Sequence, residues 1–180
     1  MRRTAADAAR TRTELLDAAL VVFAEKGWSG ATFDGIARAA GVTRGAVHHH
    51  FPDKDTLLRE VLRAQWERRG GVVLGPLHDP GSPPGPRLVA FVENYLDLLH
   101  SDPGLRALAV VSTLVAPRTD PTAADLADKQ ASTDAWGSEI RAVLVEAGPL
   151  RPGLDADLGV FVLMNFLMGA VVAVAAHPVA

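Results

Sequence analysis

The stretch from Thr32 to Phe51 reads TFDGIARAAGVTRGAVHHHF. It predicts two short helices joined by a tight turn, with Gly41 at the turn in a left-handed conformation that glycine adopts without a steric penalty. Ile36 and Ala37 fall on the inner side of the first helix, and Val47 falls on the inner side of the second. This pattern is typical of a helix-turn-helix, in which the second helix lies in the major groove of DNA.

The segments on either side of this motif are also predicted to be helical. Upstream, apolar side chains recur at helical spacing over residues 15–23. The run from Thr11 to Glu14 suits a capping box at the start of that helix, and Gly27 suits its C-terminal cap. Downstream, Pro52 ends the second motif helix, because proline disfavours a helical conformation in the residue before it. Asp53 is then placed to cap a further helix.

Residues 11 to 62 resemble the TetR family of bacterial transcriptional regulators. The resemblance rests on residue type and spacing in the runs LLDAA (15–19), FAEKGW (23–28), GVTRGAV (41–47) and HFPDK (50–54). Such proteins usually carry an aromatic residue, most often tyrosine, where this chain has His48. The family implies an all-α protein with two domains. Residues 1–51 would form a three-helix DNA-binding domain with the helix-turn-helix, and residues 52–180 a helical ligand-binding and dimerisation domain.

Candidate DNA-binding residues lie on the second motif helix and beside it. With Val47 pointing inward, Gly45 and His49 point most directly outward, and His48 lies on the flank. Arg44 is the candidate base-reading residue, because its guanidinium matches guanine O6 and N7. The alternative for the histidines is simple solvent exposure. The predicted set is Thr43, Arg44, Gly45, His48 and His49, joined by Thr32 and Lys54, for which the resemblance implies phosphate contacts at helix starts.

The three consecutive histidines, His48 to His50, do not predict a metal site. Their side chains project in three directions from a regular helix, so they cannot bind one ion together. His50 falls on the inner side and is expected to pack in the core. We therefore expect neither a metal nor a cofactor.

Charge is unevenly divided along the chain. Residues 1–70 carry 12 basic and 9 acidic side chains, whereas residues 71–180 carry 6 and 12. A basic N-terminal part suits contact with DNA phosphates, and an acidic remainder would be kept away from the duplex. Two interpretations remain open for the first residues: a mobile arm that follows DNA, or a solvated, disordered terminus. The arm would contain Arg2, Arg3, Arg10 and Arg12.

Several classes of function are disfavoured by the composition. The chain has no cysteine, which excludes disulfides, thiol redox sensing and cysteine-based metal sites. The first residues lead into an amphipathic helix and not into an apolar signal core, so a cytoplasmic location is expected. There is no nucleophile elbow, no HExxH motif and no glycine fingerprint for a cofactor, so we do not expect an enzyme.

The C-terminal part is predicted to begin with a break and to continue with four helices. Residues 70–86 contain five glycines and five prolines, which indicates a linker or a long loop. Apolar periodicity and Asp-Pro start signals then place helices at about residues 87–100, 102–116, 120–147 and 155–176.

The last of these helices leaves two interpretations open. Residues 158–176 carry a single polar side chain, Asn165, and are long enough to cross a membrane. No cluster of positive charge flanks them, however, and small residues at four-residue spacing would let two helices approach closely. The resemblance implies a homodimer built on the last two helices, against the alternative of a membrane anchor. The predicted interface comprises Val143, Phe161, Asn165, Phe166, Gly169 and Ala173.

The family also implies a ligand cavity among the middle helices. Its lining would be mostly apolar, which suits a small hydrophobic effector. The alternative for each residue is plain core packing. The candidates are Trp66, Phe91, Asn94, Tyr95, Leu99, Leu114, Trp136, Met164 and Asn165.

The resulting hypothesis is a ligand-responsive transcriptional regulator. The resemblance implies that it acts as a repressor. It would bind a palindromic double-stranded DNA operator as a homodimer and be released by a small molecule, with no membrane partner. A helical enzyme or a membrane-tethered interaction protein is the alternative.

Overall fold

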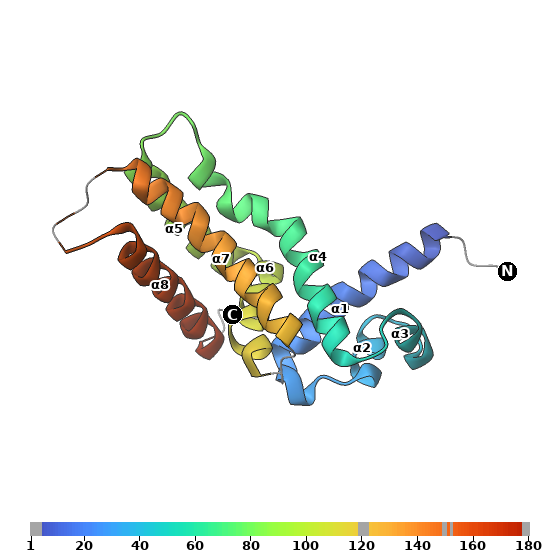
Figure 1. The fold of residues 1–180 in the computed structure, drawn as a ribbon. Coiled ribbons are helices and arrows are strands. Elements are labelled where there is room, and N and C mark those ends of the chain that lie inside the picture. Colours follow the sequence, from blue (N-terminus) through green and yellow to red (C-terminus); the bar gives the residue numbers. More distant parts are fainter. Residues whose placement is uncertain (1–4, 119–122, 149–150, 152, 178–180) are drawn as a thin grey trace. The chain divides into compact units, whose positions relative to one another are not determined.

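The computed structural model describes residues 5–118, 123–148, 151 and 153–177. This described part is all-α, as expected, and contains no strand (Figure 1). The chain forms two compact units: unit 1 lies within residues 1–69 and 103–119, and unit 2 within residues 70–102 and 120–180. The elements are α1 (Ala5–Gly30), α2 (Phe33–Ala39), α3 (Arg44–His50), α4 (Lys54–Leu74), η1 (Gly75–His78), α5 (Pro84–Ser101), α6 (Pro103–Val110), η2 (Val111–Val115), η3 (Ala116–Arg118), α7 (Ala123–Glu146) and α8 (Ala156–Ala176).

Helix α1 begins earlier than the sequence predicted. It starts by Ala5, so Thr11 is buried inside the helix and the predicted capping box is wrong. The physical reason is the alanine-rich run before Thr11, which favours helix strongly enough to extend it. Gly27 does interrupt the helix, with φ +64°, and one further turn follows it to Gly30.

The same helix removes two arginines from the proposed N-terminal arm. Arg10 and Arg12 lie on α1 within unit 1, so the arm prediction is wrong for both. The Arg12 Nη2 lies 3.0 Å from the Glu60 Oε2 of α4, and its guanidinium lies 5.0 Å from the Phe51 ring centroid. Arg12 therefore braces α1 against α4 and the end of α3. Arg2 and Arg3 lie outside the described residues.

Helices α2 and α3 form the predicted helix-turn-helix. Ile36, Ala37 and Val47 are all buried, so the two helices pack on their inner sides. Helix α2 ends in a Schellman motif, in which Val42 N–H donates to Ala37 O over 2.9 Å and Gly41 N–H donates to Arg38 O over 3.2 Å. Gly41 has φ +66°, which confirms the left-handed turn that the sequence predicted.

We expect Gly41→Ala and Gly45→Ala to change stability in opposite directions. A Cβ at Gly41 would meet nothing within 4 Å, so its cost of about 1–2 kcal/mol comes from backbone strain alone. Gly45 lies inside α3, where alanine is the better helix former by up to about 1 kcal/mol. Free energies of unfolding from urea titrations measure both. Equal stability of the two variants would contradict the assigned turn.

Helix α4 begins where Asp53 caps it. Thr56 N–H donates to Asp53 Oδ1 over 2.6 Å, and this hydrogen bond holds the pKa of Asp53 below its usual range. Leu57 and Val61 are buried in the core of unit 1. Helix α6 and the π-helical turn η2 lie against α1 and complete that core. The functional boundary at residue 51 stays a prediction.

The predicted linker at residues 70–86 is largely helical, so that prediction is wrong. Helix α4 continues through Gly70 and Gly71 to Leu74, η1 follows it, and α5 begins at Pro84. The helix is stabilised here by two kinds of long-range contact, which sequence composition does not reveal. Val73 and Leu77 are buried, and the Asn94 amide of α5 donates to the carbonyls of Val72 and Val73 over 3.0 and 3.2 Å. These contacts in unit 2 hold the glycine-rich end of α4.

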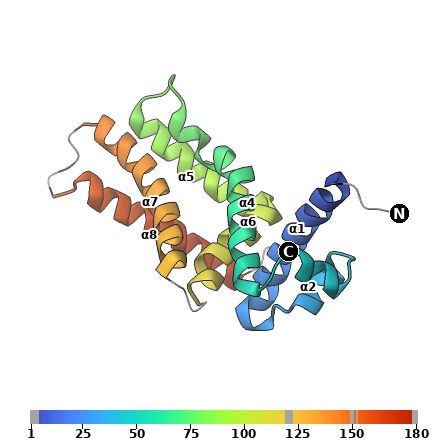
Figure 2. The same ribbon diagram turned by 45° about the vertical axis from the view of Figure 1, so that its right-hand side comes forward.

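Unit 2 is built on α5, α7 and α8. Helices α7 and α8 run side by side in both views of the ribbon (Figures 1 and 2). Leu158 N–H donates to Asp155 Oδ1 over 2.8 Å, which confirms the predicted start of α8, and its end at Ala176 also agrees. The predicted Asp120–Pro121 start of α7 lies outside the described residues. Buried side chains from all three helices meet in the core: Phe91, Tyr95, Leu99, Ile140, Val143, Leu167 and Val171.

Candidate nucleic-acid interface

Helix α3 has one face that anchors it and one that faces outward. Thr43 caps the helix by accepting a hydrogen bond of 3.2 Å from Ala46 N–H. Val47 is fully buried, whereas the residues predicted to face DNA are exposed: Arg44, Gly45, His48 and His49. The orientation of α3 therefore follows from one buried valine and one local cap.

His50 differs from the prediction of a core histidine. It is half-buried, and its ring lies 5.4 Å from the His49 ring and 6.2 Å from the Phe51 ring. The buried aromatic residue at this end of α3 is Phe51, one position later. Within the described part of the chain, no three histidine, aspartate or glutamate side chains form a group able to hold a metal ion.

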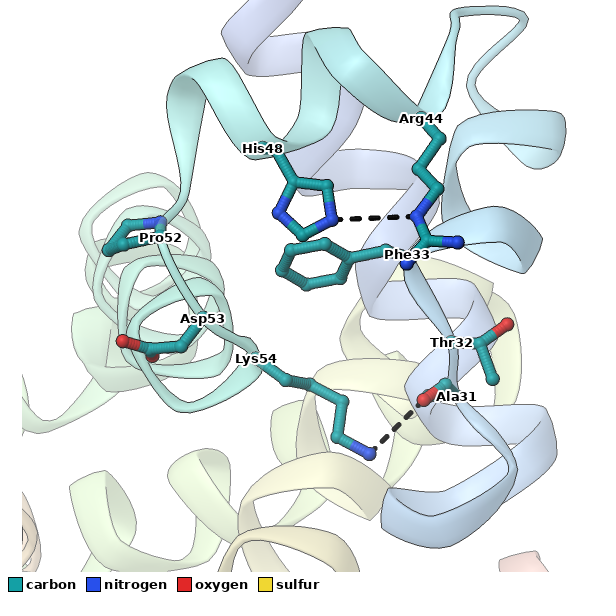
Figure 3. Close-up of a pocket in the computed structure, with 8 residues that line it drawn as sticks. All are labelled: Ala31, Thr32, Phe33, Arg44, His48, Pro52, Asp53 and Lys54. Atoms are coloured by element: carbon teal, nitrogen blue, oxygen red, sulfur yellow. Dashed lines mark hydrogen bonds between the residues drawn. The ribbon is translucent and has the colours of Figure 1, made fainter.

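A pocket of about 340 Å³ lies beside α3 in unit 1, where the starts of α2 and α4 meet it (Figure 3). It brings together four of the predicted DNA-binding residues, Thr32, Arg44, His48 and Lys54. Thr43, Gly45 and His49 do not line it. The full lining is Ala31, Thr32, Phe33, Arg44, His48, Pro52, Asp53 and Lys54.

Arg44 is held across the two motif helices. Its Nη1 lies 3.2 Å from Asp34 Oδ2 on α2. Its Nε lies 3.5 Å from His48 Nε2, one turn along α3, and Figure 3 shows this second contact. The side chains of Arg44 and Asp34 are 62% and 58% exposed. An ion pair this exposed stabilises by about 0–1 kcal/mol, so phosphate or a base edge can replace it.

His48 lies against Phe33 at the rim of the pocket. The two rings meet edge to face, with centroids 4.6 Å apart and an angle of 63° between their planes. Phe33 and Asp34, the first two residues of α2, are functional neighbours that the sequence reasoning missed. Their place directly after the Thr32 cap is the signal that could have found them.

Lys54 closes the opposite side of the pocket. Its ammonium donates to the carbonyls of Trp28 and Ala31 over 2.7 and 3.2 Å and lies 4.1 Å from the Trp28 ring centroid. These contacts hold the turn between α1 and α2. An ammonium has three N–H donors, so these two carbonyls leave one of them unused. Thr32 caps α2 by accepting from Gly35 N–H over 3.1 Å.

The comparisons with known proteins agree with this geometry. Residues 15–61 match the model of bacterial regulatory proteins of the tetR family. This part of the chain is therefore similar to the DNA-binding region of TetR-family regulators. The matched residues run from the buried stripe of α1 to the first part of α4 and include the whole helix-turn-helix.

Individual relatives resemble either the DNA-binding part or the whole chain. The transcriptional regulator SrpR of Pseudomonas putida is 55% identical over 64 residues, which are 36% of this chain and only 30% of that protein. UidR of Escherichia coli K12 is 25% identical over 175 residues, which are 97% of this chain and 86% of UidR. A solved structure of NalD, a repressor of a multidrug efflux pump in Pseudomonas aeruginosa, superposes with a TM-score of 0.67 at 26% sequence identity. The match covers 96% of this chain and 87% of NalD.

The candidate ligand-binding residues fall in both units. Trp66 and Leu114 belong to unit 1, where Trp66 Nε1 donates to Ser112 Oγ over 3.1 Å. The others belong to unit 2: Phe91, Asn94, Tyr95, Leu99, Trp136, Met164 and Asn165.

Three aromatic side chains of unit 2 form a cluster. The Trp136 ring lies 6.1 Å from that of Phe91 and 6.0 Å from that of Tyr95, both in edge-to-face geometry. Burial raises the pKa of Tyr95 to about 12, so its phenol is neutral and can donate a hydrogen bond. The side-chain amide of Asn94 already donates hydrogen bonds to two carbonyls of α4. The exposed Asn165 amide donates to Phe161 O over 2.7 Å.

The candidate dimer residues lie mainly on the outer side of α8. Phe161, Asn165, Phe166, Gly169 and Ala173 are exposed, whereas Val143 of α7 is buried inside unit 2. Large apolar side chains dominate the exposed side of α8. By length and composition α8 could span a membrane, and only 11% of its most apolar window is buried in the chain. The exposed apolar residues of α8 are Leu158, Phe161, Val162, Phe166, Met168 and Val172.

Proposed function

We propose that this chain is a ligand-responsive DNA-binding transcriptional regulator that acts as a repressor. The observation that carries the proposal is the exposed outer side of α3, from which Arg44 and His48 line one pocket together with Lys54. Helix α3 inserts into the major groove, as the recognition helix of such motifs does. The chain acts by binding and not by catalysis.

Each DNA contact follows from the geometry of unit 1. Arg44 exchanges Asp34 for guanine O6 and N7 in the groove. The pocket receives a backbone phosphate, to which Thr32, His48 and Lys54 direct hydroxyl, imidazole and ammonium groups. Thr43, Gly45 and His49 contact the duplex along the rest of α3.

The chain binds its operator as a homodimer formed through α8. An apolar helix of this length, exposed on one side, needs a cover of similar chemistry, and a second α8 supplies it. Small residues at Gly169 and Ala173 let two helices approach closely. A twofold axis then sets the two α3 helices on half-sites about one helical turn apart. The protein is cytoplasmic, and it has no membrane partner.

A small hydrophobic effector releases the operator. The aromatic cluster of unit 2 supports such a ligand, because its surroundings are apolar and the neutral Tyr95 phenol offers one donor. The effector acts by binding more tightly to a conformation that does not fit DNA. A hundredfold loss of operator affinity requires about 2.7 kcal/mol of difference between the two conformations.

Selection of bound sequences from a pool of random DNA duplexes tests the proposed function. The purified full chain is expected to enrich palindromic sequences with half-sites about 10 base pairs apart. An excess of unrelated duplex DNA should not displace the enriched sequences, because specific binding exceeds non-specific binding by at least about a thousandfold. Recovery of no shared sequence would contradict the function.

A further inference from the structure

His48 is the position at which this chain departs from the pattern that it resembles. The residues around His48 hold its side chain in a specific geometry. Its ring packs edge to face on Phe33, and its Nε2 accepts a long hydrogen bond of 3.5 Å from Arg44 Nε. Arg44 is also paired with Asp34. The base-reading candidate is therefore held at two points in the chain without DNA.

The contact between Arg44 and His48 requires a neutral imidazole in one particular tautomer. A guanidinium only donates, so Nε2 must carry a lone pair and the proton must lie on Nδ1. An imidazolium has no acceptor nitrogen, and its charge repels that of Arg44. Imidazole side chains change charge between pH 5 and pH 8, so this contact can be made or broken in the physiological range.

Charged groups of both signs surround the ring. Helix α2 contributes Asp34, and the start of α4 contributes Asp53 and Lys54 at the pocket that His48 lines. Helix α3 itself contributes Arg44 and the neighbouring His49 and His50.

We propose that His48 is a proton-dependent positioning residue for Arg44, and that the operator affinity of this chain rises as the pH falls through the imidazole range. The proposal rests on the DNA-binding function proposed above. Protonation of His48 frees the Arg44 Nε and places a cationic donor where a backbone phosphate is seated. Both effects favour the complex, so DNA binding takes up a proton.

The sign and the size of the effect follow from linkage. Because the complex holds the proton more tightly than the free chain does, affinity increases as protons become available. A difference of one unit in proton affinity corresponds to a tenfold change in the binding constant. We therefore expect each protomer to contribute about a tenfold rise between pH 8 and pH 6, so the operator affinity of the dimer should rise about a hundredfold. The salt dependence should steepen by about 0.9 in log–log slope for each protomer, or about 1.8 for the dimer, because each protomer adds one phosphate contact.

The experiment compares the wild-type chain with His48→Gln and His100→Gln by fluorescence anisotropy on the selected operator. The measurements span pH 5.5 to pH 8 at constant ionic strength. His100→Gln removes the same kind of side chain from α5 in unit 2, and His100 is not among the candidate DNA-binding residues. Since His48 and His100 are both exposed, both variants should fold, and thermal unfolding by circular dichroism checks this.

The outcomes separate this inference from the proposed function. A rise of about a hundredfold for wild type and His100→Gln, which is about tenfold for each protomer, with a nearly flat profile for His48→Gln, supports it. Operator binding that does not vary with pH, a profile that survives His48→Gln, or one that His100→Gln abolishes would overturn it and leave the function standing. Failure to bind any DNA sequence at every pH would overturn both.

A second measurement needs no DNA. Nitrogen-15 NMR of the free chain at pH 8, with the His48 signals assigned by their loss in His48→Gln, is expected to show the Nδ1–H tautomer. The Nε2–H tautomer would remove the acceptor from Arg44 and overturn the positioning contact.

Discussion

Arg44→Ala is expected to weaken operator binding by about 1–3 kcal/mol for each half-site, because every protomer loses one bidentate contact to guanine. For a dimer on a palindrome the loss is therefore about twice as large. Discrimination at one base pair of each half-site should relax at the same time. Competition titrations on the selected operator, with that base pair substituted, measure both effects.

A matched control for Arg44→Ala lies on another helix of unit 1. Arg63 is an exposed arginine of α4 that pairs with Glu60 over 2.8 Å and with Glu67 over 2.7 Å. Arg63→Ala removes the same charge and the same exposed ion pairing away from α3. It should leave sequence preference unchanged. Unaltered discrimination in Arg44→Ala would show that Arg44 contacts only the backbone.

Gly169→Leu is expected to raise the dissociation constant of the dimer at least about tenfold. In the single chain, a Cβ at Gly169 would meet nothing within 4 Å, and Gly169 is exposed, so a larger side chain starts in open space. Leucine also has a higher helix propensity than glycine, so the substitution favours α8 in the isolated chain. Any loss must therefore come from a neighbouring molecule that approaches α8. Sedimentation equilibrium in detergent-free buffer measures it.

Gly159→Ala is the control for Gly169→Leu. A Cβ at Gly159 would lie 3.0 Å from Leu144 Cδ1, so this change disturbs the packing of α8 on α7 inside the chain. It should lower the free energy of unfolding more than it affects dimerisation. A Gly169→Leu dimer of undiminished stability would show that α8 packs elsewhere, and a chain recovered only with membranes would favour the anchor.

The helix-turn-helix could be predicted from the sequence because its causes are local. The Thr32 and Thr43 caps bond to residues three positions away, and Gly41 occupies the one turn position that requires positive φ. Signals of this kind are complete within a few residues, so a single sequence contains them. The same holds for Asp155 at the start of α8.

The errors have non-local causes. Counting glycines and prolines predicted a break at residues 70–86, but Asn94, about twenty residues later, binds the carbonyls that end α4. In the same way, the Asp34 partner of Arg44 becomes visible only when the turn brings α2 and α3 together. A buried aromatic residue such as Phe91 gives the same sequence pattern in a core as in a ligand site. Spacing alone could not separate the two.

Chemical footprinting of the selected operator tests most directly whether a dimer sets one α3 in each of two successive major grooves. Guanine N7 lies in the major groove, so methylation there reports occupancy by α3. The account predicts two protected guanine patches about 10 base pairs apart on one face of the duplex, both lost with Arg44→Ala. A single protected patch, or protection confined to the minor groove, would contradict it.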